Sequence, residues 1–323
     1  MTDFYIILWA VVPPLLLLGF YSNRIPTSPS VMRLLFFFIC GAISGFLAFY
    51  LESAFENAAN QVVTWRLIQR TFFGVILRQI LEVAPIEEGC KLGAVFIPIY
   101  YLQRQYRLRT STIYLFSLAA SLGFTAQENW VYLFYGFYGA VSILERLISI
   151  PVHAIFSAPW GYALAIFFGS RYLHRYTDLL LKSWFNSVIC HALVNIFSLS
   201  GRFLFPLNLL VYGLFPFFLW MYWRLEQLLR RVQGQDAIAL ISSHKPKQRH
   251  TQKLLVALTL ILGGNAIFMM FVALRSFLNQ SQRFYPDAML FIVSRLFLSV
   301  IFGLLSWFIY RYLRQLVHHR RYF

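Results

Sequence analysis

The chain has 323 residues, of which 59% are hydrophobic and only 12% are charged. A soluble domain carries about 25% charged residues, so this composition excludes an ordinary soluble protein and predicts a polytopic membrane protein. The formal net charge of +16 does not indicate binding to nucleic acid, because the basic residues are scattered through the connections between apolar segments.

Nine apolar segments are each long enough for a membrane-spanning helix of about 20 residues. They cover residues 4–20, 34–52, 75–101, 111–135, 150–170, 183–200, 205–223, 254–274 and 288–310. The connections between them are short, so the sequence predicts an all-α, polytopic transmembrane helical bundle of about nine helices. We expect a single membrane domain over residues 1–323, with one basic loop at 224–253 and an additional C-terminal helix pair at 254–310.

The basic residues of the connections are distributed asymmetrically. Alternate connections, beginning after the first segment, hold 19 of the 28 Lys and Arg residues, and the other connections hold 6. Since basic loops remain in the cytoplasm, this asymmetry predicts that the N-terminus lies outside and that the C-terminus and the basic loop are cytoplasmic.

The third segment contains two adjacent carboxylates and an ammonium, Glu87, Glu88 and Lys91. A charge at the centre of a bilayer costs roughly 2.5–3.5 kcal/mol, so three charges in one apolar segment indicate a function. Glu87 and Lys91 are four residues apart and Glu88 and Lys91 are three apart, so on a helix either carboxylate can pair with the ammonium. One carboxylate is left without a partner of its own, which suits a general base.

The next three segments also bring polar groups to membrane depth. These groups are Glu128 and Asn129 in the fourth segment, His153 and Ser157 in the fifth, and His191 and Asn195 in the sixth. Each group alone is explained by hydrogen bonding between helices. Together they exceed what helix packing requires, and we expect them to face one water-accessible cavity.

Hydrolysis of a peptide bond requires a base that takes a proton from water and donors that hold the oxyanion. Glu87 or Glu88 suits the base. His191 and Asn195 lie one helical turn apart, so both can direct an N–H group at the same oxygen. Glu128 and His153 are placed to orient the water or to shuttle the proton, and Lys91, Asn129 and Ser157 are supporting residues.

A zinc-dependent variant uses the same residues. His153 and His191 with either Glu88 or Glu128 form a familiar ligand set for catalytic zinc. The sequence contains no His-Glu-x-x-His motif, so the spacing gives little support for this set. The prediction is therefore no cofactor, with Zn²⁺ as the alternative.

The polar residues form an ordered series of motifs. They are Glu-Glu-x-x-Lys at 87–91, Phe-x-x-x-Glu-Asn at 124–129, a His at 153 and His-x-x-x-Asn at 191–195. This series resembles the PrsW family of intramembrane proteases, which is related to the CAAX prenyl endopeptidases and the bacteriocin-processing proteases. The resemblance covers roughly residues 75–200, which we therefore take as the catalytic core.

The resemblance implies hydrolysis of a membrane-associated protein, with Glu87 activating water and His191 and Asn195 forming the oxyanion hole. The related endopeptidases have His where this chain has Glu128. The family implies a substrate such as a single-pass anti-sigma-type protein, cut in regulatory, site-1-type proteolysis, and a place in the bacterial plasma membrane. Its members are described both as metalloproteases and as glutamic proteases.

Two other functions would also explain polar groups in the membrane. A proton-coupled transporter gathers acids and histidines near the membrane midplane, but it more often shows inverted repeats and broken helices. A non-catalytic membrane scaffold would keep the same residues for structural reasons. We expect an intramembrane protease, and these two functions are the alternatives.

Overall fold

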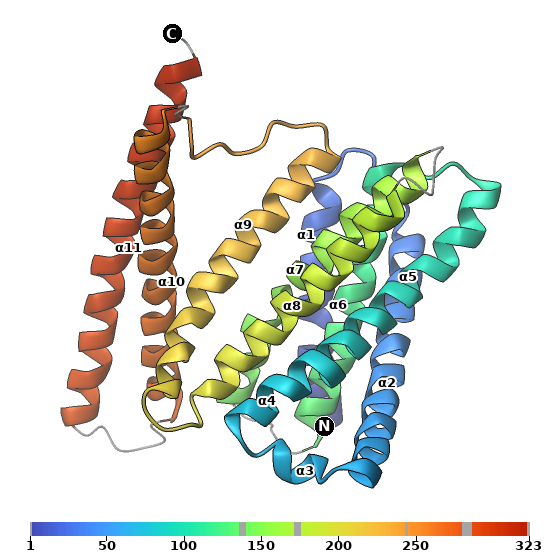
Figure 1. Cartoon of the computed structure of the whole chain (residues 1–323), viewed down its shortest axis with the longest axis horizontal. Helices are drawn as coiled ribbons and strands as arrows, with labels where there is room; N and C mark the ends of the chain where they lie inside the picture. Colours follow the sequence, from blue (N-terminus) through green and yellow to red (C-terminus); the bar gives the residue numbers. More distant parts are fainter. Residues whose placement is uncertain (1, 136–139, 171–175, 243–244, 280–285, 322–323) are drawn as a thin grey trace. The chain divides into compact units, whose positions relative to one another are not determined.

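A computed structural model describes residues 2–135, 140–170, 176–242, 245–279 and 286–321, and it contains no strand in these ranges (Figure 1). The α-helices are α1 (Thr2–Asn23), α2 (Val31–Val62), α3 (Trp65–Ile68), α4 (Phe72–Arg78), α5 (Ala84–Gln105), α6 (Thr110–Phe134), α7 (Ala140–Gly169), α8 (Thr177–Ser200), α9 (Leu214–Val232), α10 (Pro246–Asn279) and α11 (Pro286–Arg321). A π-helix (Gln79–Val83) joins α4 to α5, and a 3₁₀ helix (Leu207–Gly213) precedes α9.

The predicted helical membrane bundle is confirmed. Within the described ranges, six helices are long and apolar enough to cross a membrane, namely α1, α2, α7, α8, α10 and α11. The other predicted segments also lie largely on helices, but these helices carry more polar or charged residues, so the predicted number of nine spans is approximate. The N-terminus-outside orientation and the single membrane domain stay predictions.

The boundaries of α9 differ most from the sequence prediction. The seventh segment was expected at 205–223, whereas its first part is the 3₁₀ helix and α9 continues to Val232. Most of the predicted basic loop at 224–253 is therefore helical, because α9 ends after Arg231 and α10 begins at Pro246. Residues 243–244 of that loop lie outside the described residues.

The chain divides into two compact units, each described separately. The first comprises residues 1–196 with 228–235, and the second comprises 197–227 with 236–323. In the first unit, α6 packs against α1, α2, α5 and α7, and its side chains from Ser111 to Gln127 are all buried. In the second unit, α10 and α11 pair along their length (Figure 1).

Small residues allow α2 and α6 to approach closely, as is common between membrane helices. A Cβ atom on Gly41 of α2 would collide with the backbone of Ala120, and one on Gly123 of α6 would collide with the backbone of Phe38. Because the opposing atoms belong to the backbone, they cannot move aside as the end of a flexible side chain could.

Short helices connect α2 to the helix that carries the charged motif. Thr71 caps α4 by accepting a hydrogen bond from the backbone N–H of Gly74, at 3.0 Å. The π-helix that follows carries Glu82, which is fully buried and accepts a hydrogen bond of 2.8 Å from the indole N–H of Trp65 in α3. π-Helices occur mostly as single turns and are frequent at functional sites, so this one indicates that a functional site lies near the start of α5.

We expect Gly41→Val to lower the free energy of unfolding by about 1–3 kcal/mol, because overpacking forces the backbones of α2 and α6 apart. Thermal unfolding of the detergent-purified protein measures this change. Gly19→Val in α1 is the matched control, since nothing lies within 4 Å of a Cβ atom at Gly19. Equal stability of the two variants would contradict the close α2–α6 packing.

Candidate functional site

The charged motif occupies the first turns of α5. Glu88 and Lys91 are fully buried, and the side chain of Glu87 is 12% exposed. Because Glu87 and Glu88 are four and three residues before Lys91, the helix directs both carboxylates toward the ammonium. The Lys91 Nζ atom lies 3.2 Å from Glu87 Oε2 and 2.8 Å from Glu88 Oε1.

The Lys91 ammonium has a third partner on α7. Its Nζ atom lies 3.0 Å from Nδ1 of His153, and it also lies over the ring of Phe124 at 4.0 Å from the centroid. An ammonium is only a donor, so Nδ1 of His153 must accept this hydrogen bond. His153 Nε2 then carries the proton and donates to Glu128 Oε2, at 2.7 Å.

Glu88 is surrounded by donors from three helices. Its Oε1 atom accepts from Lys91 and lies 3.1 Å from Nδ1 of His191 on α8. Its Oε2 atom accepts from the indole N–H of Trp160 at 2.9 Å and from the Ser157 hydroxyl at 3.4 Å. An ionised carboxylate accepts about four hydrogen bonds, so Glu88 has no acceptor position left for a further donor.

Glu87 has far fewer partners than Glu88. Lys91 is its one hydrogen-bond donor within the described residues. Its Oε2 atom lies 3.9 Å from His153 Nδ1 and 3.8 Å from His191 Nε2, which is near but beyond direct hydrogen-bonding distance. Glu87 therefore keeps free lone pairs beside two imidazole rings.

Glu128 lies at the outer end of this cluster of charges. Its side chain is 39% exposed, and besides His153 it contacts the Arg146 guanidinium of α7 at 3.3 Å. Arg146 also lies over the ring of Tyr132, at 4.2 Å from the centroid. A continuous chain of hydrogen bonds thus runs from the exposed Glu128 through His153 and Lys91 to Glu87.

Of the two residues in the His-x-x-x-Asn motif at 191–195, only His191 contacts the cluster of charges. His191 stacks on Phe156, with ring centroids 4.4 Å apart, and contacts both carboxylates of α5. Asn195, one turn further along α8, donates from Nδ2 to Oε1 of Gln79 at 2.8 Å instead. The amide of Asn195 is thus tied to the π-helix, and its role at the same oxygen as His191 stays a prediction.

Asn129 is buried beside Glu128 but does not join the cluster. Neither its amide nitrogen nor its amide oxygen has a hydrogen-bond partner among the described residues, although the side chain is fully buried. Ordered water commonly satisfies such groups in proteins. Its assignment as a supporting residue stays a prediction.

A comparison with known families decides the identity of the chain. The family model described as PrsW family intramembrane metalloprotease matches residues 29–221, which is more than half of the sequence. The chain belongs to the PrsW family. It is therefore an intramembrane protease, and the matched range includes every residue of the cluster. Neither the curated proteins nor the solved structures give a significant match to it.

The PrsW family name implies a metal ion, and the ligand set of this member can be tested against zinc. Both ring nitrogens of His153 are engaged, by Lys91 and Glu128, and Nδ1 of His191 is engaged by Glu88. A zinc ion on His153 Nδ1 would lie next to the Lys91 ammonium, which repels it. In the part of the chain that the structure describes, no three His, Cys, Asp or Glu side chains are arranged to hold a metal ion. The predicted set of His153, His191 and Glu88 or Glu128 is thus held in hydrogen bonds rather than grouped around one ion, and the absence of a metal stays a prediction.

Sequence reasoning missed three residues of the candidate site. Trp160 resembles an ordinary packing residue of an apolar helix, and nothing in its spacing marks its N–H group as a donor to Glu88. Arg146 was assigned to a connection between helices, whereas it lies within α7. Gln79 precedes the motif and reaches Asn195 from a π-helix, which sequence patterns do not predict.

We expect Trp160→Phe to lower the free energy of unfolding by about 1–3 kcal/mol, because it removes one donor from a buried carboxylate. Trp184→Phe is the matched control for the loss of ring volume. The Trp184 indole N–H is buried and has no hydrogen-bond partner among the described residues, so no bond is lost there. Thermal unfolding of both variants in detergent measures the difference, and equal destabilisation would contradict the role of the Trp160 N–H group.

Proposed function

We propose that this protein hydrolyses a peptide bond of a membrane-embedded protein substrate, with water as the nucleophile and Glu87 as the general base. The observation that carries this assignment is the contrast between the two carboxylates of α5. Glu88 accepts hydrogen bonds from four side chains, whereas Glu87 has one donor and is partly exposed. A base needs a free lone pair that can take a proton from water, and of these two carboxylates Glu87 has it.

His191 is proposed as the donor that stabilises the oxyanion. His191 lies beside both carboxylates of α5, with Nδ1 at 3.1 Å from Glu88 Oε1 and Nε2 at 3.8 Å from Glu87 Oε2. When both ring nitrogens carry a proton, Nδ1 donates to Glu88 and Nε2 is left to donate to the substrate carbonyl oxygen.

The steps conserve protons. Glu87 removes a proton from water while the water oxygen bonds to the carbonyl carbon, and the carbonyl oxygen becomes an oxyanion held by His191. The C–N bond then breaks, and Glu87 returns the same proton to the departing amine. The second N–H of the Asn195 amide, the first being held by Gln79, is proposed as an additional oxyanion donor.

His153, Lys91 and Glu128 are proposed to position Glu87 and to exchange protons with the exterior. The Lys91 ammonium fixes the Glu87 carboxylate through a contact of 3.2 Å. The His153–Glu128 hydrogen bond continues this contact to a carboxylate that is 39% exposed. The contacts therefore connect the buried base with a carboxylate that is partly exposed.

The substrate and the topology belong to the same proposal. The distribution of basic residues supports an N-terminus outside and a C-terminus in the cytoplasm. Family membership supports a membrane protein as substrate. A single-pass, anti-sigma-type protein of a bacterial plasma membrane is the first candidate that we propose.

We expect Glu87→Gln to reduce cleavage of a single-pass substrate on the order of 10²–10⁴-fold, because the amide cannot accept a proton from water. Cleavage by purified protein in liposomes measures this loss, and thermal unfolding should stay close to that of the wild type.

Glu88→Gln is the informative comparison, because it should lower both the activity and the unfolding temperature. Glu56→Gln is the control for charge, since Glu56 pairs with the exposed Arg66 at 2.7 Å, away from the cluster. Wild-type cleavage by the Glu87→Gln variant would overturn the assignment of the base.

We also propose that the reaction needs no metal ion, which the engagement of His153 by Lys91 supports. A zinc chelator at saturating concentration should leave the rate of cleavage unchanged, and metal analysis of active protein should find far less than one zinc per chain. Loss of activity on chelation, restored by added zinc, would overturn the metal-free mechanism and leave the peptidase assignment intact.

A further inference from the structure

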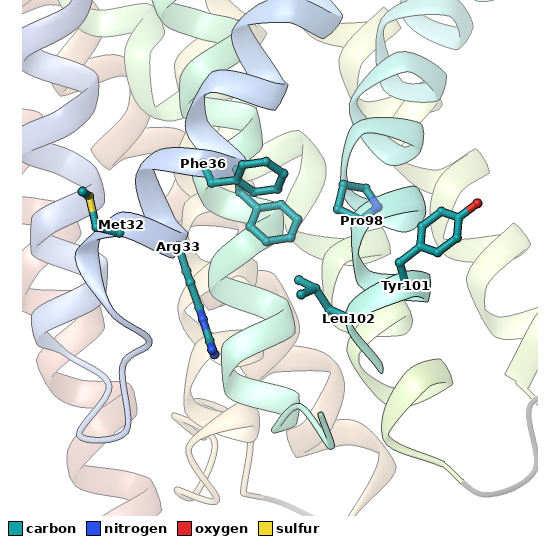
Figure 2. Close-up of a pocket in the computed structure, with 7 residues that line it drawn as sticks. Met32, Arg33, Phe36, Pro98, Tyr101 and Leu102 are labelled. Atoms are coloured by element: carbon teal, nitrogen blue, oxygen red, sulfur yellow. The ribbon is translucent and has the colours of Figure 1, made fainter. Parts of the chain in front are cut away.

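A groove of about 460 Å³ lies between α2 and α5, away from the charged cluster (Figure 2). It is lined by Met32, Arg33, Phe36, Phe37, Pro98, Tyr101 and Leu102. Leu102 follows Lys91 by about three helical turns, so the groove and the candidate catalytic site occupy different parts of α5. The PrsW chemistry described above does not use it.

The groove has an apolar wall and one charged end. Figure 2 shows Phe36 and Arg33 directed toward opposite ends of the groove, with Pro98 and Leu102 on the facing helix. Phe36 is 50% exposed and Met32 is 77% exposed, so the wall is open to the surroundings of the protein. For helices that cross a membrane, these surroundings are lipid.

No Asp or Glu in the described part of the chain forms an ion pair with Arg33. The sequence has no Asp or Glu between Asp3 and Glu52 or between Glu88 and Glu128, so the parts of α2 and α5 that line the groove carry none. Among the described residues, the contact of the Arg33 guanidinium is with the ring of Tyr106, at 5.7 Å from its centroid. Arg33 can therefore accept an anionic group from outside the chain.

The size of the groove limits its occupant. A transmembrane helix about 10 Å wide and about 30 Å long fills roughly 2,000 Å³ or more, which is several times the groove volume of about 460 Å³. A single acyl chain is narrow enough to lie along the wall. Since the loop charges predict that this end of α2 faces the cytoplasm, the adjacent leaflet is the one that carries anionic lipids.

We propose that this groove is a binding site for one anionic phospholipid, with an acyl chain against Phe36 and Leu102 and its phosphate at Arg33. The site does not depend on the proposed peptidase mechanism. A basic residue near the membrane surface is worth about 1 kcal/mol toward anionic lipid, so the expected preference over a neutral lipid is about fivefold.

Native mass spectrometry of the detergent-purified full chain tests this proposal. The probes are phosphatidylglycerol and phosphatidylcholine with identical acyl chains, added at equal concentration. We expect one phosphatidylglycerol to be retained per chain, about fivefold better than phosphatidylcholine. Equal retention of the two lipids by the wild type would overturn the proposal.

Two substitutions separate the headgroup from the acyl chain. Arg33→Gln should abolish the preference between the two lipids, whereas Lys182→Gln, which removes a charge from a side chain that is 79% exposed on α8, should keep it. Leu102→Trp should fill the groove and reduce retention of both lipids, whereas Leu258→Trp on an exposed face of α10 should not. An unchanged preference in Arg33→Gln, or unchanged retention in a folded Leu102→Trp variant, would contradict this site.

Discussion

The site depends on one buried ammonium. Lys91 is fully buried, and its three donors are directed at Glu87, Glu88 and the imidazole of His153. An isolated buried charge is costly, so the two carboxylates and the cation require one another. This triple contact fixes the helix pair α5–α7, selects the protonated nitrogen of His153 and thereby orients Glu128. Removal of the cation would leave two adjacent carboxylates in a site that excludes most water.

The same contact leaves two chemically identical side chains in different surroundings. Glu88 is enclosed by donors and acts as a fixed negative charge that holds α7 and α8 against α5, through Trp160 and His191. Glu87, one residue earlier, lies at the edge of the cluster and keeps free lone pairs. This difference between Glu87 and Glu88 follows from helix geometry. A step of one residue turns the side chain by about 100° around the helix axis and so changes its neighbours. Adjacent carboxylates on a helix are therefore not interchangeable.

Much of this arrangement could be predicted from the sequence, because charges in apolar segments are costly and few partners are available. The pairing of Glu87 and Glu88 with Lys91 follows from residue spacing alone, and so does the shared face of His191 and Asn195. The contacts between helices could not be predicted, because spacing within a helix does not say which faces meet. Glu128 thus binds His153 and Arg146, and Trp160, a residue with no polar signature, completes the environment of Glu88. The end of α9 was misjudged for a similar reason, since an amphipathic helix does not stop where its apolar run stops.

The π-helix between α4 and α5 connects the candidate site with the short helix α3. It inserts one extra residue per turn into a helix that is otherwise continuous from Phe72 to Gln105. Within this single turn, Glu82 is held by Trp65 of α3 and Gln79 holds Asn195 of α8. The hydrogen bonds of this one turn therefore reach both the short helix α3 and the amide beside His191, so a single five-residue segment joins the candidate site to the connection that follows α2.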